Sequence, residues 1–133
     1  MDGDSSMLPA AVALAARDDV VAVVVVVGDT GCTGVHSCSC GEVADRSELD
    51  LAGGQMPLLR GVTSAVLGRA VPVPVIVVHV GGRPATFGGN ATHDNTGLEG
   101  VDGLLAAYRP GQEGAMAIAR LLAGVTSPGG RLA

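Results

Sequence analysis

Two apolar runs dominate the hydrophobic pattern of the chain, and neither alternates with polar residues. The first, Val20 to Val27, consists almost entirely of β-branched valine, and the second, Val75 to Val80, is interrupted by a single histidine. Runs of this length and composition predict strands with both faces buried, as in a parallel sheet covered by helices. A shorter run from Gly103 to Tyr108 predicts a third strand.

Helical patterns occupy the stretches around these runs. The alanine-rich segment Ala10 to Arg17 predicts a short helix. A second helix is predicted from Met56 to Leu67, where the apolar residues of one face are Leu58, Leu59, Val62, Ala65 and Val66. A third follows the Pro110–Gly114 turn. The alternation of helices and strands predicts an α/β fold, a three-layer α/β/α sandwich with a mainly parallel sheet.

Length and charge exclude several classes of protein. The 133 residues correspond to about one domain. A net charge of -5 provides no basic surface for nucleic acid or for an anionic membrane. The longest apolar run has eight residues, whereas a membrane helix needs roughly 20. We therefore expect neither nucleic acid nor a membrane as a partner.

The candidate chemistry lies in the long segment from residue 28 to residue 54, which has no periodic pattern. A loop of this length inside a compact domain is usually functional or disordered. It leaves the carboxyl end of a predicted strand, where open α/β sheets bind their ligands. Its charged residues include Asp29, Glu42, Asp45 and Arg46. Any catalysis by this chain is therefore expected in this loop.

The same loop contains three cysteines and a histidine: Cys32, His36, Cys38 and Cys40. Five residues and one residue separate the cysteines, which does not match the paired spacing of zinc sites, so we expect no metal site in this cluster. In an oxidising compartment Cys32 could pair with Cys38 or Cys40 and leave one cysteine over. Three free thiols are the alternative.

Three motifs follow one another along the chain. The first is Glu42-x-x-Asp45-Arg46-Ser47-x-Leu49-Asp50-Leu51-x-Gly53-x-Gln55. The second is Val77-Val78-x-Val80-x-Gly82-Arg83-Pro84. The third is Pro110-Gly111-Gln112-Glu113-Gly114, followed by Leu121-Leu122-Ala123-Gly124 and Pro128-x-Gly130-Arg131-Leu132. In this order they resemble the C-terminal α/β sandwich domain of glycoside hydrolase family 3, which includes β-glucosidases, β-xylosidases and β-N-acetylglucosaminidases.

The resemblance implies a larger, two-domain enzyme that hydrolyses terminal β-linked sugars, such as a β-xyloside or a β-glucoside. The reaction would be a double displacement that needs no metal and no organic cofactor. A preceding barrel domain, which this sequence lacks, would supply the aspartate nucleophile. We expect residues 1–8 to be disordered and residues 9–133 to form a truncated family 3 C-terminal domain. The expected partners are that barrel and a β-linked oligosaccharide, and the parent enzyme is expected to be secreted. The isolated chain is predicted to be inactive.

The resemblance assigns Glu42, three residues before Asp45, as the acid/base catalyst. Retaining glycosidases use two carboxyl groups about 5–5.5 Å apart, and the proton donor needs a raised pKa. A solvated loop glutamate is the alternative for Glu42. Asp29, Asp45 and Arg46 are the candidate substrate-binding residues. Asp29 could instead bind its own loop backbone, and Arg46 could instead anchor the loop to the sheet edge.

The other polar residues are expected to have structural roles. Asp50 and Gln55 are predicted to cap the second helix. His79 lies in a buried strand and is expected to be a satisfied core or sheet-end histidine, not a catalyst. The sequon at Asn90 matters only if the chain is secreted.

Two alternative functions were compared with the glycosidase. A non-catalytic carbohydrate-binding or scaffolding remnant is possible, but one Tyr, one Phe and no Trp provide few rings on which a sugar could stack. A nucleotide-binding α/β protein would need a Gly-x-Gly-x-x-Gly cradle after its first strand, and that motif is absent. The glycosidase domain is therefore the preferred hypothesis.

Overall fold

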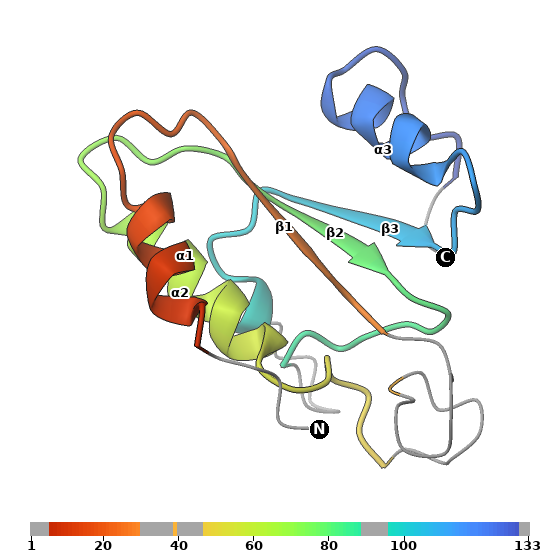
Figure 1. Ribbon diagram of the computed structural model, residues 1–133, viewed down its shortest axis with the longest axis horizontal. Coiled ribbons are helices and arrows are strands. Elements are labelled where there is room, and N and C mark those ends of the chain that lie inside the picture. Colours follow the sequence, from red (N-terminus) through yellow and green to blue (C-terminus); the bar gives the residue numbers. More distant parts are fainter. Residues whose placement is uncertain (1–5, 30–38, 40–46, 89–95, 131–133) are drawn as a thin grey trace.

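The computed structural model describes residues 6–29, 39, 47–88 and 96–130 of the chain. Its elements in chain order are α1 (Leu8–Ala15), β1 (Val23–Gly28), α2 (Gln55–Leu67), β2 (Val75–Val80), the 3₁₀ turn η1 (Thr96–Leu98), β3 (Gly103–Tyr108) and α3 (Gly114–Leu122) (Figure 1). The predicted order of helices and strands is confirmed, and β2 and β3 have the predicted bounds. Helix α1 begins earlier than predicted, and β1 begins three residues later.

The three strands form one parallel sheet in the order β1-β2-β3. β1 pairs with β2 along its whole length, from Val23 opposite Val75 to Gly28 opposite Val80. β3 pairs with the other edge of β2, with a register shift at the carboxyl end of β2. The predicted α/β sandwich with a parallel sheet is confirmed.

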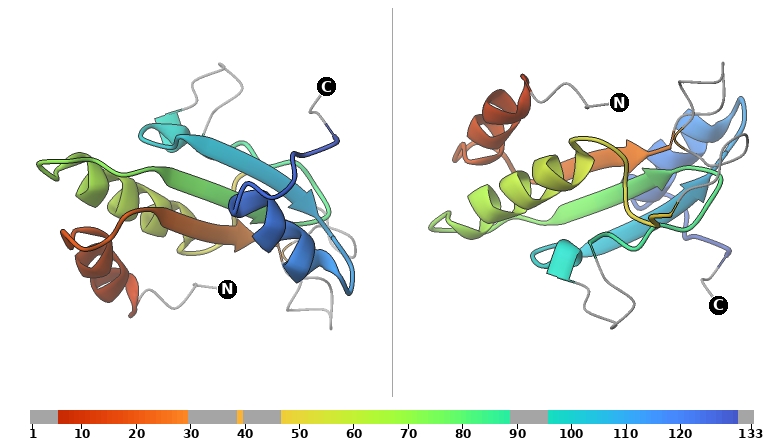
Figure 2. Two further views of the ribbon diagram at one scale, coloured as in Figure 1. Left: turned by 90° about the horizontal axis from the view of Figure 1, so that it is seen from above. Right: turned by 90° about the horizontal axis from the view of Figure 1, so that it is seen from below.

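Helices α1 and α2 lie side by side over one face of the sheet (Figure 2). The core on this face joins the predicted stripe of α2 to alternate residues of the strands, and its buried members include Val25, Val27, Leu59, Val62, Val66, Val75 and Val77. Gly61 allows α1 to approach α2 closely, because a Cβ there would lie 2.9 Å from Cγ2 of Val12. This packing determines which residues of β1 face the helices.

The opposite face of β1 is exposed among the described residues. Val24 is 45% exposed and Val26 is 64% exposed. Helix α3 lies on that side of the sheet (Figure 2), but it follows β3, the strand at the other edge. The prediction that both faces of the first strand are buried is therefore wrong for the part of the chain that the structure describes.

Candidate functional site

The carboxyl ends of the three strands form a continuous edge. The N–H of Asp29 donates to the carbonyl of Val80 at 3.1 Å, and the N–H of Gly81 donates to the carbonyl of Tyr108 at 3.0 Å, so pairing extends beyond the strand ends. Gly28 is required for this approach, because a Cβ there would lie 1.7 Å from the Val80 carbonyl oxygen. The long loop begins at this edge.

The side chain of Gln55 binds the end of β1. Its Oε1 accepts the N–H of Gly28 at 2.7 Å, and its Nε2 donates to the Gly28 carbonyl at 2.9 Å and to the Ala52 carbonyl at 2.9 Å. The N-cap of α2 is Gly54, and no side chain caps this helix end. The predicted capping role of Gln55 is therefore wrong: its side chain forms amide pairs with the strand instead.

Arg83 links three parts of the edge. Its Nη2 donates to Oδ1 of Asp29 at 3.2 Å and to the Asp50 carbonyl at 2.8 Å, and its Nη1 donates to the carbonyls of Leu49 and Pro84 at 2.8 and 3.0 Å. The Nε–Oδ2 distance to Asp29 is 3.1 Å, an ion-pair contact without hydrogen-bond alignment. The side chains are 15% exposed for Arg83 and 0% for Asp29. The two form a largely buried ion pair.

The carboxylate of Asp50 organises the segment after Arg83. Its Oδ1 accepts a bond from Oγ1 of Thr86 and another from the N–H of Gly88, both at 2.5 Å. The N–H of Thr86 also donates to the Leu49 carbonyl at 3.2 Å. Asp50 therefore joins two loops and does not cap α2, so the predicted cap is wrong for this residue too.

His79 is buried beside the ion pair and is 5% exposed. Burial lowers the pKa of its imidazole, Asp29 opposes that shift, and Arg83 adds to it, so the site favours the neutral ring. Its Nε2 has no hydrogen-bond partner in the described part of the chain, so the expectation of a satisfied core histidine is wrong on that point. Gly81 lies next to both the His79 ring and the Asp29 carboxylate: a Cβ at this position would lie 3.2 Å from Nε2 of His79 and 3.3 Å from Oδ2 of Asp29.

Together these contacts hold the two ends of the long loop at one place. We call Gly28–Asp29 the first stem and Leu49–Gln55 the second stem. Gln55 binds the first stem directly, and Arg83 binds both stems at once. These stem contacts close the base of the loop at the carboxyl edge of the sheet.

Of the predicted site residues, the structure describes Asp29 alone. Glu42, Asp45 and Arg46 lie outside the described residues, as do the cysteine cluster and the sequon. Sequence reasoning did not assign a role to Arg83. The available signal was its place in the short turn that follows the second predicted strand.

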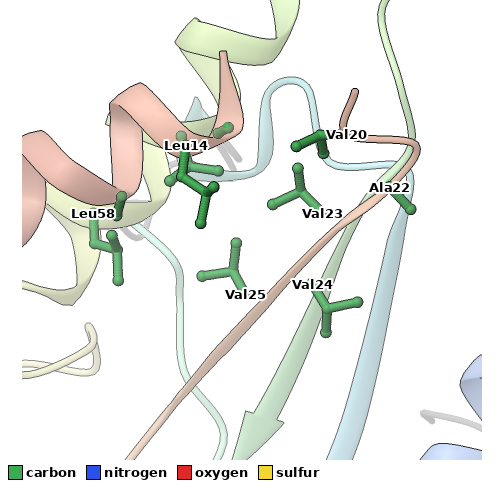
Figure 3. Close-up of a pocket in the computed structure, with 10 residues that line it drawn as sticks. Leu14, Val20, Ala22, Val23, Val24, Val25 and Leu58 are labelled. Atoms are coloured by element: carbon green, nitrogen blue, oxygen red, sulfur yellow. The ribbon is translucent and has the colours of Figure 1, made fainter. Parts of the chain in front are cut away.

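The other features of the described residues offer no competing chemistry. A cavity of about 380 Å³ between α1 and β1 is lined by aliphatic residues such as Leu14, Val23 and Leu58 (Figure 3). It lies along the amino half of β1, away from the stems. Within the described ranges no group of His, Cys, Asp and Glu could hold a metal ion, and no helix is long and apolar enough to cross a membrane.

Comparisons with known proteins agree with the motifs. Residues 4–133 match the glycosyl hydrolase family 3 C-terminal domain. The chain is 34% identical over 124 residues to a protein of Formosa agariphila named beta-xylosidase. That alignment covers 93% of this chain and 14% of the relative, so the chain spans about a seventh of that protein's length. No solved structure gave a significant match.

Proposed function

The chain belongs to glycoside hydrolase family 3, in which it corresponds to the C-terminal domain, and from this membership we propose that it contributes the acid/base loop of a retaining β-glycosidase. The proposed substrates are terminal β-linked xylosides or glucosides. The name of the 34% identical relative favours the xyloside. The nucleophilic aspartate is proposed to lie on a barrel domain of the whole enzyme.

The observation that carries the proposal is the closed base of the loop. Glu42 lies in sequence between the two stems, which Gln55 and Arg83 hold together at the carboxyl edge of the sheet. Open α/β sheets bind their ligands at this edge. A carboxyl group on a loop that starts and ends here is suited to reach a substrate held against this edge.

In the proposed reaction Glu42 acts twice. It first gives its proton to the leaving oxygen while the nucleophile attacks the anomeric carbon and the glycosidic C–O bond breaks. It then takes a proton from water, whose oxygen bonds to the anomeric carbon and releases the nucleophile. Asp45 and Arg46 are the proposed substrate contacts. The side chain of Asp29 is fully buried against Arg83, so its proposed contribution to binding is indirect.

Glu42→Gln in the full-length enzyme tests the proposal. Glycosides with poor leaving groups should lose about 10²–10⁴ in kcat/KM, whereas activated aryl glycosides, which need no proton, should lose little. Added azide should restore turnover of the activated substrate, because it attacks the glycosyl-enzyme without a general base. Glu99→Gln, which changes an exposed carboxylate near η1, is the matched control and should have full activity.

Equal, small losses with both substrate classes would contradict the role of Glu42. A full-length protein that binds β-linked sugars and cleaves none of them would instead support the non-catalytic remnant.

A further inference from the structure

We infer that Arg83 is a positioning residue for this reaction: by binding both stems of the loop, it sets the direction in which the acid/base carboxyl is presented. The inference rests on the proposed function. Arg83 does not contact the reacting atoms in this account. It acts through the loop backbone.

The contacts of Arg83 are arranged for this task. The Nε–Nη2 edge of the guanidinium lies against the Asp29 carboxylate on the first stem. Nη2 also donates to the Asp50 carbonyl, and Nη1 donates to the Leu49 carbonyl, both on the second stem. These partners lie 54, 34 and 33 residues away in sequence. A rigid, planar group that binds both stems fixes the distance between them and their relative orientation.

Stability alone does not explain the arrangement. A buried ion pair adds little net stability, because desolvation of both charges offsets their attraction. Placement of a catalytic group is far more demanding: a displacement of about 1 Å can cost roughly 100-fold in rate. Polar contacts that fix the orientation of the loop at its base meet this need for accurate placement.

Arg69 provides a matched control in the same chain. It follows α2 at the other end of the sheet, and its Nη2 donates to the Val20 carbonyl at 2.9 Å. Like Arg83, it holds loop backbone through carbonyl groups and is partly buried. Its contacts are far from the stems, so its loss should affect folding without affecting the acid/base step.

The test compares Arg83→Gln, Arg83→Lys and Arg69→Gln in the full-length enzyme, with kcat/KM measured for one poor and one activated leaving group. Arg83→Gln should lower kcat/KM about 100-fold for the substrate with the poor leaving group and less than about fivefold for the activated substrate. Arg83→Lys should give a smaller loss of the same selective kind, because one ammonium cannot reproduce the fork. Arg69→Gln should lower both substrates equally, in proportion to any unfolded fraction.

A double-mutant cycle gives the sharper result. If Arg83 acts through Glu42, Arg83→Gln should add almost nothing to the selective loss already caused by Glu42→Gln. Equal losses for both leaving groups in the Arg83 variants, or additive losses in the cycle, would overturn the inference. Where Arg83→Gln does not fold, Arg83→Lys provides the same comparison.

The outcomes separate this inference from the proposed function. If Glu42→Gln shows the leaving-group dependence and the Arg83 variants do not, Arg83 has no positioning role and the proposed function stands. If Glu42→Gln itself shows no such dependence, both proposals fail.

Discussion

Replacing Gln55 by alanine removes the most direct contact between the two stems. The substitution deletes three hydrogen bonds, of 2.7, 2.9 and 2.9 Å, and leaves the N–H and C=O of Gly28 without their amide partner at a partly buried position. The backbone of α2 is unaffected, because Gln55 is its first residue and alanine favours helix. The change therefore isolates the side-chain contact.

The expected cost follows from those bonds. A typical intramolecular hydrogen bond contributes about 1 kcal/mol net, and a partner left unpaired in a buried place costs about 1–3 kcal/mol. Three bonds, reduced by the few tenths of a kcal/mol that alanine gains in a helix, predict a loss of about 2–3 kcal/mol in the free energy of unfolding. The partial exposure of the site keeps the value at the lower end of the burial penalty.

Urea denaturation of the chain measures this loss. With an m-value of about 1–3 kcal/mol per molar, the midpoint should fall by roughly 1–2 M while m is unchanged. Gln112→Ala, at an exposed position before α3, is the matched control and should change the free energy of unfolding by less than about 0.5 kcal/mol. A Gln55→Ala midpoint as close to wild type as that control would refute the reasoning.

Three further predictions concern folding. Gly28→Ala should reduce the yield of folded protein or lower the thermal midpoint by more than about 10 °C, because its Cβ would overlap the neighbouring strand, whereas Gly129→Ala, with open space around it, should be silent. Leu59→Ala should lower the unfolding free energy in urea by about 2–5 kcal/mol, because the side chain is 0% exposed, and Leu67→Ala, which is 54% exposed, by much less. Burial lowers the pKa of His79 from 6.5, so below about pH 6.5 the unfolded chain binds a proton that the folded chain does not, and stability falls as the pH falls. Thermal midpoints at about pH 7 and pH 5.5 should differ less for His79→Gln than for wild type, and equal differences would contradict this.

The sequence was sufficient to predict the order of elements because local signals agree with the tertiary structure. Pro72 and Pro74 mark the start of β2, and Pro110 marks the turn before α3. The start of β1 was predicted three residues too early because its valine run begins before the point where β2 can pair with it. Pairing begins at Val23, whose N–H donates to the Pro74 carbonyl, so Val20 has no strand to pair with.

The site was less predictable because its contacts join residues far apart in sequence. Asp29 was identified from its place after a strand, yet its partner Arg83 lies 54 residues further on. Gln55 and Asp50 stand where helix caps are common, and the competing partners that bind them, Gly28 and Thr86, are known once the strands are aligned. Patterns in a single sequence predict local helix capping. They do not show that a residue distant in sequence binds the same side chain instead.

Stability and loop placement therefore depend on different residues of this domain. The free energy of folding comes mainly from the aliphatic contacts between α2 and the sheet, with Leu59 among them. The stem contacts are polar, and in a largely buried ion pair such as Asp29–Arg83 the cost of desolvation offsets most of the attraction. Conservative core variants such as Leu59→Val should thus lower the urea midpoint and leave the leaving-group dependence of the full-length enzyme intact. Arg83→Lys should change the leaving-group dependence and leave the urea midpoint nearly unchanged. A core variant that changed the leaving-group dependence would show that the two properties are not separable.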